Sequence, residues 1–124
     1  MNDLKIQSTA TTPEVNFNPE GAFKIKGRSI HENITDFFKP VFGWLDHYVK
    51  APADLTCVDI NLEYFNSATA KMLINMLQKI TEVQFKHKKF MINWYYEDGD
   101  DDVFEKGEYF SSVLKIPFNF IRIV

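Results

Sequence analysis

Short stretches in which apolar and polar residues alternate predict strands near the start of the chain. The alternation covers residues 4–7 (LKIQ) and residues 22–26 (AFKIK), and a period of two is typical of strands with one buried face. The segment between them is polar and contains Pro13, Pro19 and Gly21. Because proline and glycine favour turns, we predict two strands joined by a loop or a loose hairpin.

A longer segment, residues 31–50, has the three- and four-residue spacing of one helical face. Its apolar positions are Ile34, Phe37, Phe38, Val41, Phe42, Leu45, Tyr48 and Val49. Pro40 lies inside this pattern, where it removes one backbone donor and clashes with the preceding turn. The spacing therefore predicts a helix that is kinked or that begins later than residue 31, with Asn33 or Ser29 as its cap.

The next segment, residues 55–65 (LTCVDINLEYF), has two faces of different character. One face carries Val58, Ile60, Leu62 and Tyr64, and the other carries Cys57, Asp59, Asn61 and Glu63. This alternation predicts a strand with one apolar face. A helix follows directly, because apolar residues recur at three and four positions from Met72 to Val83 and the basic residues 86–89 suit the negative end of a helix.

The last third of the chain alternates in the same way. Residues 89–96 (KFMINWYY) predict a strand, residues 97–100 a turn, residues 101–114 a helix and residues 117–124 a final strand. The predicted order, β-β-α-β-α-β-α-β, is typical of a single α/β domain over residues 1–124. Right-handed crossovers predict a mixed, largely parallel sheet, and the polar face of the central strand predicts helices mainly on the other face.

Composition and charge favour a compact protein that binds other proteins. The chain has 124 residues, of which 45% are hydrophobic and 15% aromatic, enough to bury a core. A formal net charge of -3 lacks the basic excess of nucleic-acid-binding proteins, so we expect no nucleic-acid partner. No stretch approaches the ~20 apolar residues of a membrane span. Cys57 has no second cysteine to pair with, which predicts an inert buried thiol in a cytoplasmic protein.

The most informative polar residues, Asn66, Ser67 and Thr69, lie where the predicted central strand passes into a helix. In an open α/β sheet, sites form at this carboxyl end of a strand. The first turn of the helix has unpaired backbone donors and a partial positive charge, so it accommodates an anion. Phosphorylation would add ~1.5 to 2 negative charges there. The simpler interpretation is that Asn66 or Ser67 caps the helix.

Four motifs carry a resemblance to a known family, namely YFNSATAKML, INWYYEDGDDD, EKGEYF and the terminal PFNFIRI. With these motifs the chain resembles, over nearly its whole length, the SiaC family of small bacterial regulatory phosphoproteins. The fold of that family is similar to the STAS domain of anti-sigma-factor antagonists. Its phosphorylated residue is the hydroxyl residue directly after the asparagine, so the resemblance implies phosphorylation of Ser67.

The resemblance also implies a partner-switching pathway. A protein kinase phosphorylates the switch protein, a PP2C-type phosphatase reverses this, and the unphosphorylated form binds and activates a diguanylate cyclase, a GGDEF protein. Cyclic di-GMP signalling and biofilm behaviour follow. The family pattern often has threonine at the modified position and small hydroxyl residues after it, so Thr69 is a second candidate here. We expect the partner-binding residues to be Asn66, Ser67, Thr69, Lys71 and Tyr95.

Two other functions are compatible with the residues alone. A STAS-like small-molecule or nucleotide-binding module would hold a ligand phosphate at the same helix start near Ser67. A hydrolase or transferase would use Asp59 and Glu63 as an acid pair. The chain contains no glycine-rich nucleotide loop and no nucleophile-base arrangement, which favours a non-catalytic protein without a cofactor.

Candidate metal ligands are scattered along the chain. His31, His47 and His87 lack the spacing of a metal site. The acidic residues 97–102 lack the alternating ligands and the terminal glutamate of a calcium loop. We therefore predict no metal site, and we interpret this acidic segment as a solvated turn followed by a helix start with Asp102 as its cap.

Overall fold

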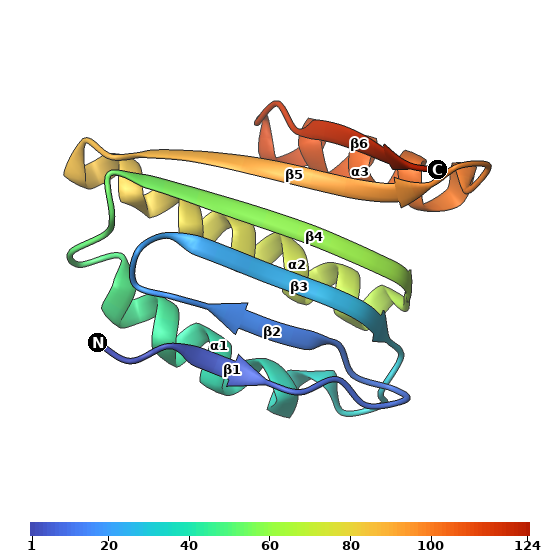
Figure 1. Cartoon of the computed structure of the whole chain (residues 1–124), viewed down its shortest axis with the longest axis horizontal. Helices are drawn as coiled ribbons and strands as arrows, with labels where there is room; N and C mark the ends of the chain where they lie inside the picture. Colours follow the sequence, from blue (N-terminus) through green and yellow to red (C-terminus); the bar gives the residue numbers. More distant parts are fainter.

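Six strands form one sheet whose spatial order, β1-β2-β3-β4-β5-β6, is also their order in the chain (Figure 1). The computed structural model describes all residues, 1–124. The strands are β1 (Leu4–Ile6), β2 (Glu14–Phe17), β3 (Ala22–Ser29), β4 (Leu55–Phe65), β5 (Lys89–Glu97) and β6 (Asn119–Ile123). The helices are α1 (Ile34–Tyr48), α2 (Ser67–Ile80), η1 (Thr81–Lys86), which is a 3-10 helix, and α3 (Asp101–Leu114).

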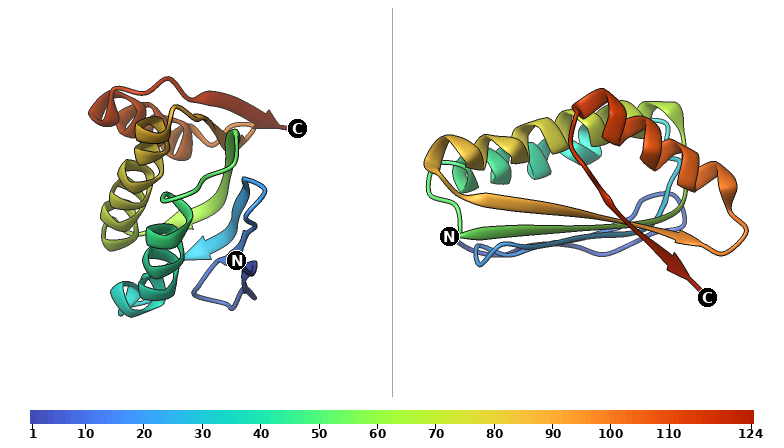
Figure 2. Two further views of the ribbon diagram at one scale, coloured as in Figure 1. Left: turned by 90° about the vertical axis from the view of Figure 1, so that its left-hand side faces the viewer. Right: turned by 90° about the horizontal axis from the view of Figure 1, so that it is seen from above.

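The sheet is mixed, and its parallel part carries all the helices. β1, β2 and β3 pair antiparallel, whereas β3, β4, β5 and β6 pair parallel. Each parallel crossover contains one α-helix, and because such crossovers share one hand, helices between successive strands fall on the same side. Figure 2 shows α1, α2 and α3 on one face of the sheet and none on the other. The predicted α/β class, mixed sheet and one-sided helical cover are confirmed.

One strand was missed in the sequence. β2 lies in the segment that we predicted as a loop, so three strands rather than two precede α1. It is only four residues long and lies between Pro13 and Pro19, which conceals its alternation. Val15 and Phe17 are nevertheless fully buried, and β2 pairs with both β1 and β3. Tertiary burial therefore outweighs the local turn signals here.

The predicted apolar face of β4 is wrong at its end. The pairing of β3 with β4 shifts between Gly27 and Arg28, so that Leu62 lies opposite Gly27 and Tyr64 lies opposite Arg28. Such a bulge inserts one residue and changes which face the following side chains take. Tyr64 is consequently 52% exposed, whereas Phe65 is buried.

The predicted helix caps agree with the structure only in part. Asn33, one of the two predicted caps of α1, occupies the N-cap position before Ile34, but its side chain makes no cap hydrogen bond, and the alternative, Ser29, belongs to β3. Pro40 lies within α1, whose buried face includes Ile34, Phe38, Val41, Leu45 and Tyr48. α3 begins two residues earlier than an Asp102 cap requires, because Asp100 is the cap and its carboxylate accepts the Val103 N–H at 3.1 Å.

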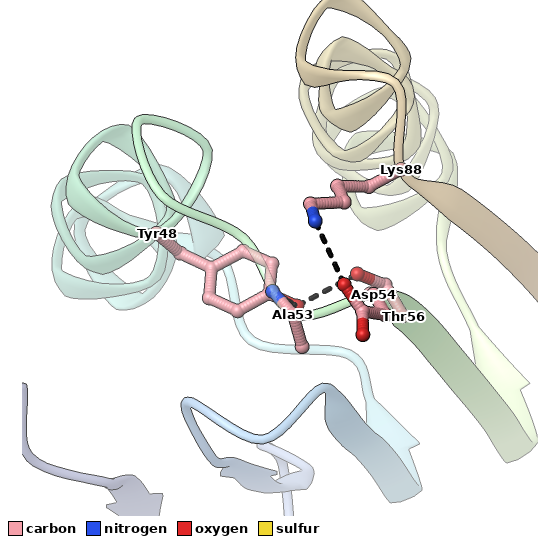
Figure 3. Close-up of polar contacts among 5 residues, drawn as sticks. All are labelled: Tyr48, Ala53, Asp54, Thr56 and Lys88. Atoms are coloured by element: carbon pink, nitrogen blue, oxygen red, sulfur yellow. Dashed lines mark hydrogen bonds and ion pairs between the residues drawn. The ribbon is translucent and has the colours of Figure 1, made fainter.

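The connection from α1 into β4 is fixed by hydrogen bonds at the amino end of β4 (Figure 3). The buried Tyr48 hydroxyl lies 2.7 Å from Thr56 Oγ1 and accepts the Ala53 N–H at 3.2 Å. Beside it, Lys88 Nζ donates to the exposed Asp54 carboxylate at 2.7 Å and lowers the pKa of Asp54. This end of β4 is opposite the end where α2 begins.

None of the helices has both the length and the apolar composition that a membrane span requires.

Candidate functional site

The turn between β4 and α2 is built by Asn66. Its backbone is extended, and its side-chain Oδ1 accepts the Thr69 N–H at 2.9 Å, which satisfies one of the free donors of the first helical turn. Asn66, rather than Ser67, is therefore the helix cap. Ser67 is the first residue of α2 and is exposed, as is Ala68.

Thr69 has a different environment from Ser67. Its side chain is fully buried, and its hydroxyl donates to the Ser29 backbone carbonyl at 3.1 Å. The Ser29 hydroxyl, which is also fully buried, lies 2.7 Å from the same Thr69 oxygen. Because the Thr69 proton is already directed to the carbonyl, Ser29 is the donor in this second bond. Thr69 therefore does not lie on the surface and has no free hydroxyl proton.

The surroundings of Ser67 are neutral to basic. The first turn of α2 contains no acidic residue, and the exposed Lys71 lies four residues after Ser67, on the same side of the helix. From α3, the Lys106 ammonium lies 4.8 Å from the centre of the Phe65 ring and 3.0 Å from the Asp102 carboxylate. A negative group on Ser67 would thus meet the positive end of α2 and a basic side chain one turn away.

Tyr95 does not belong to this site. Its neighbour Trp94 is buried toward α3, where its indole donates to the Val103 carbonyl, so Tyr95 lies on the helix-free face of the sheet. Burial, followed by the charge of Asp59 and by Cys57, raises the pKa of the Tyr95 hydroxyl. The structure thus groups Asn66, Ser67, Thr69 and Lys71 within the start of one helix and places Tyr95 on another surface.

The candidate acid pair is not assembled. Asp59 and Glu63 are four residues apart on β4, which corresponds to about 13 Å along a strand, beyond the separation of paired catalytic carboxylates. Asp59 is instead half-buried and accepts the Asn93 side-chain amide at 2.8 Å. The same amide contacts Cys57 Sγ at 3.4 Å. Burial, and next the charge of Asp59, raises the pKa of the half-buried Cys57 thiol, which keeps it protonated.

No arrangement of side chains suggests a metal or a small-molecule ligand at the α2 start. No group of three or more His, Cys, Asp or Glu residues is placed to hold a metal ion. The largest of the five main hollows, about 580 Å³, lies between the N-terminal residues and the end of α1, where Trp44 and Tyr48 line it. Neither Asn66 nor Ser67 lines any of the five main hollows.

Comparison with known proteins identifies the family. The family described as SiaC family regulatory phosphoprotein matches residues 6–123. The chain belongs to the SiaC family. A curated relative, an uncharacterized protein of Pseudomonas aeruginosa strain UCBPP-PA14, is 25% identical over 119 residues, which cover 95% of this chain and 94% of the relative.

Solved structures of SiaC from Pseudomonas aeruginosa have the same fold. The crystal structure of apo-SiaC superposes with a TM-score of 0.84 at 24% identity and covers all of both chains. A chain in the crystal structure of the diguanylate cyclase SiaD in complex with its activator SiaC gives a TM-score of 0.88 at 24% identity, covering 98% of this chain and all of that one.

Three residues beside the SiaC-family motif were not predicted from sequence. Ser29 bonds to Thr69 across 40 positions, and no local pattern indicates such a distant partner. Tyr64 is exposed only because of the bulge, and Lys106 reaches the β4 end from α3. The one available signal was that the polar Ser29 continues the alternate apolar positions Phe23 and Ile25 of its strand, which indicates a buried hydrogen bond.

Proposed function

We propose that this SiaC-family protein is a non-catalytic switch whose Ser67 is reversibly phosphorylated. A protein kinase adds the phosphate, a PP2C-type phosphatase removes it, and the unphosphorylated form binds and activates a diguanylate cyclase. Cyclic di-GMP output would then depend on the phosphorylation state of one residue. Membership of a family of regulatory phosphoproteins supports the general role.

The difference in exposure between Ser67 and Thr69 is the observation that carries the choice of site. A kinase must bring the acceptor hydroxyl into its own active site, which the exposed Ser67 permits without any change in the fold. Thr69 would have to leave a fully buried position and break its bonds to Ser29 first. Of the two candidates, Ser67 is therefore the acceptor that we propose.

The proposed cyclase partner is supported by a relative of the same fold. SiaC of Pseudomonas aeruginosa was crystallised as the activator bound to the diguanylate cyclase SiaD, and this chain matches it over almost its full length. We infer that the surface around Asn66, Ser67 and Lys71 contacts an equivalent cyclase. The exposed Tyr64 ring beside Lys106 adds an apolar element suited to such a contact.

Phosphorylation would act on this surface through charge rather than through unfolding. A phosphate on Ser67 would be accommodated by the start of α2, which lacks acidic residues, so the helix would persist. A bound partner would instead have to bury about two negative charges at a previously neutral contact. Binding would weaken because of desolvation and repulsion, while the folded state would remain intact.

Peptide mass spectrometry on protein from its native host, with and without phosphatase treatment, tests the site. We expect a removable phosphate on Ser67, and its loss in Ser67→Ala but not in Ser112→Ala, a matched control at an exposed serine on α3. Phosphate on Thr69 alone, or none under any growth condition, would contradict the proposal. In a cyclase assay with the GGDEF proteins of the same organism, Ser67→Ala should activate and Ser67→Asp should not.

A further inference from the structure

The helix-free face of the sheet is a second surface of the molecule, separate from the α2 start. Figure 2 shows this face bare along all six strands, while the three helices cover the opposite one. Its side chains come from alternate positions of each strand, because the other alternate positions enter the core. Ser67 begins a helix in the opposite layer, so whatever occupies this face leaves Ser67 accessible.

Positive charges on this face are gathered on β3. Lys24, Lys26 and Arg28 are all exposed, and they alternate with residues that point toward the core side. Only Lys24 has an ion-pair partner, the Glu14 carboxylate at 3.5 Å. Lys26 and Arg28 form no ion pair within the chain. We call these three side chains the basic row.

Negative charges are gathered on the two strands that follow. Asp59 and Glu63 lie on the same face of β4, and Glu97 lies on β5. None of the three pairs with a lysine or arginine, although Asp59 is directly opposite Lys24 in the β3–β4 pairing. Glu63 and Glu97 line a shallow hollow of about 210 Å³ that also includes Lys26. We call these three side chains the acidic row.

We propose that this face pairs with the same face of a second copy of the chain. A two-fold axis parallel to the strands, between β3 and β4, would place β3 of each copy, with its basic row, over β4 of the other, which carries Asp59 and Glu63. Lys24 would then face Asp59, and Arg28 would face Tyr64, the residue directly after Glu63. A two-fold axis across the strands would instead place the basic row on itself, so the charge pattern selects the first arrangement.

The available area fits a reversible dimer. With about 3.3 Å per residue along a strand and about 4.8 Å between strands, the sheet covers about 600 Å² per copy. Two copies would bury about 1,200 Å², the lower limit of stable protein interfaces. Because the proposed contacts join charged side chains on an exposed surface, we expect the dimer to weaken as salt increases.

Charge reversal in both rows gives a direct test by analytical ultracentrifugation of the full chain. We expect wild type to dimerise at low salt, and the variants Lys26→Glu with Arg28→Glu, and Glu63→Lys, each to raise the dimer Kd at least tenfold. An equimolar mixture of the two variants should dimerise again, because every contact then joins opposite charges. Lys50→Glu with Glu105→Lys, two exposed charges outside this face, is the matched control.

Two further measurements keep the test decisive. A variant with all three reversals should dimerise by itself, and circular dichroism shows whether each variant is folded. Cys57 lies on this face, so its alkylation should slow as wild-type protein is concentrated. A wild-type chain that stays monomeric to about 1 mM at low salt, or a folded reversal variant with unchanged Kd, would overturn the proposal. The outcome does not depend on the phosphorylation of Ser67.

Discussion

The hydroxyl groups of Ser29 and Thr69 lie 2.7 Å apart, and neither side chain is exposed to solvent. This pair joins the end of β3 to the first turn of α2 across 40 positions in the chain. The Ser29 carbonyl also accepts the Asn66 N–H at 3.1 Å. The turn before Ser67 is therefore held by hydrogen bonds to Ser29 on the neighbouring β3 as well as by its own cap, Asn66.

Replacement of Thr69 by valine should destabilise the fold although the side-chain shape is kept. The change removes both hydroxyl bonds and leaves the buried Ser29 hydroxyl with no partner, which costs about 1–3 kcal/mol. Urea unfolding should show this loss. Ser67→Ala, at an exposed position, should stay within about 0.5 kcal/mol of wild type. Equal effects of the two substitutions would contradict the assigned environments.

An acidic group at position 67 should stabilise the isolated protein while it blocks the partner. α2 has no acidic residue in its first turn, and Lys71 lies four residues further on, so Ser67→Asp should gain about 0.3–1 kcal/mol. The gain should shrink with added salt because the site is exposed. Urea unfolding at two salt concentrations measures it. A clear loss of stability would indicate that the proposed phosphate on Ser67 would act by melting α2.

The packing of α3 on β5 depends on the absence of a side chain at Gly107. A Cβ atom there would lie 2.5 Å from the Trp94 indole nitrogen, which is held in place by its bond to the Val103 carbonyl. Gly107→Ala should therefore destabilise by about 1–3 kcal/mol, despite the better helix propensity of alanine. Thermal unfolding tests this. Gly43→Ala in α1, where a Cβ meets nothing within 4 Å, is the control and should be neutral or stabilising.

The amino end of β4 should be sensitive to the Tyr48 hydroxyl. Tyr48→Phe leaves the buried Thr56 hydroxyl and the Ala53 N–H without a partner, so urea unfolding should show a loss of about 1–3 kcal/mol. Lys88→Met removes only the exposed pair with Asp54 beside it in Figure 3 and should change little at neutral pH. A larger effect of Lys88→Met than of Tyr48→Phe would be inconsistent with these contacts.

Long periodic segments were readable from the sequence because burial dictates their pattern. The helices around Leu45, Leu73 and Phe110 and the strands around Ile60 and Ile92 follow from repeats that the buried residues confirm. β2 was missed because four residues between two prolines carry too little pattern. Tyr64 was assigned to the wrong face because the bulge depends on the pairing of β4 with β3, and the sequence of β4 alone does not indicate it.

The features of the candidate site were likewise predictable only where they depend on residues close in the sequence. Asn66 as a cap and Ser67 beside it followed from local rules, since both act within four residues. The burial of Thr69 could not be predicted, because it is decided by Ser29 on a distant strand. Tyr95 was expected among the partner-binding residues, but its place relative to the α2 start depends on the position of β5 in the sheet.

The alkylation rate of Cys57, on the helix-free face, should depend on the charge of Asp59. Burial and then the Asp59 carboxylate raise its pKa, so at pH 8 it holds less thiolate than an ordinary cysteine. Asp59→Asn removes the charge and should lower this pKa. Alkylation by iodoacetamide at pH 8 should then become several-fold faster, since the thiolate is the reactive form. Glu63→Gln, on the same strand, is the control and should leave the rate unchanged.

The same raised pKa fixes the direction of the pH effect on stability. The folded state keeps the Cys57 proton to a higher pH than the unfolded chain, so its contribution is complete below the thiol pKa of the unfolded chain, about 8.5. This contribution is lost as the pH rises through the folded value. Wild type should therefore lose stability between pH 8 and pH 10 more steeply than Cys57→Ala in urea unfolding. Identical slopes would mean that the thiol has an ordinary pKa in the folded protein.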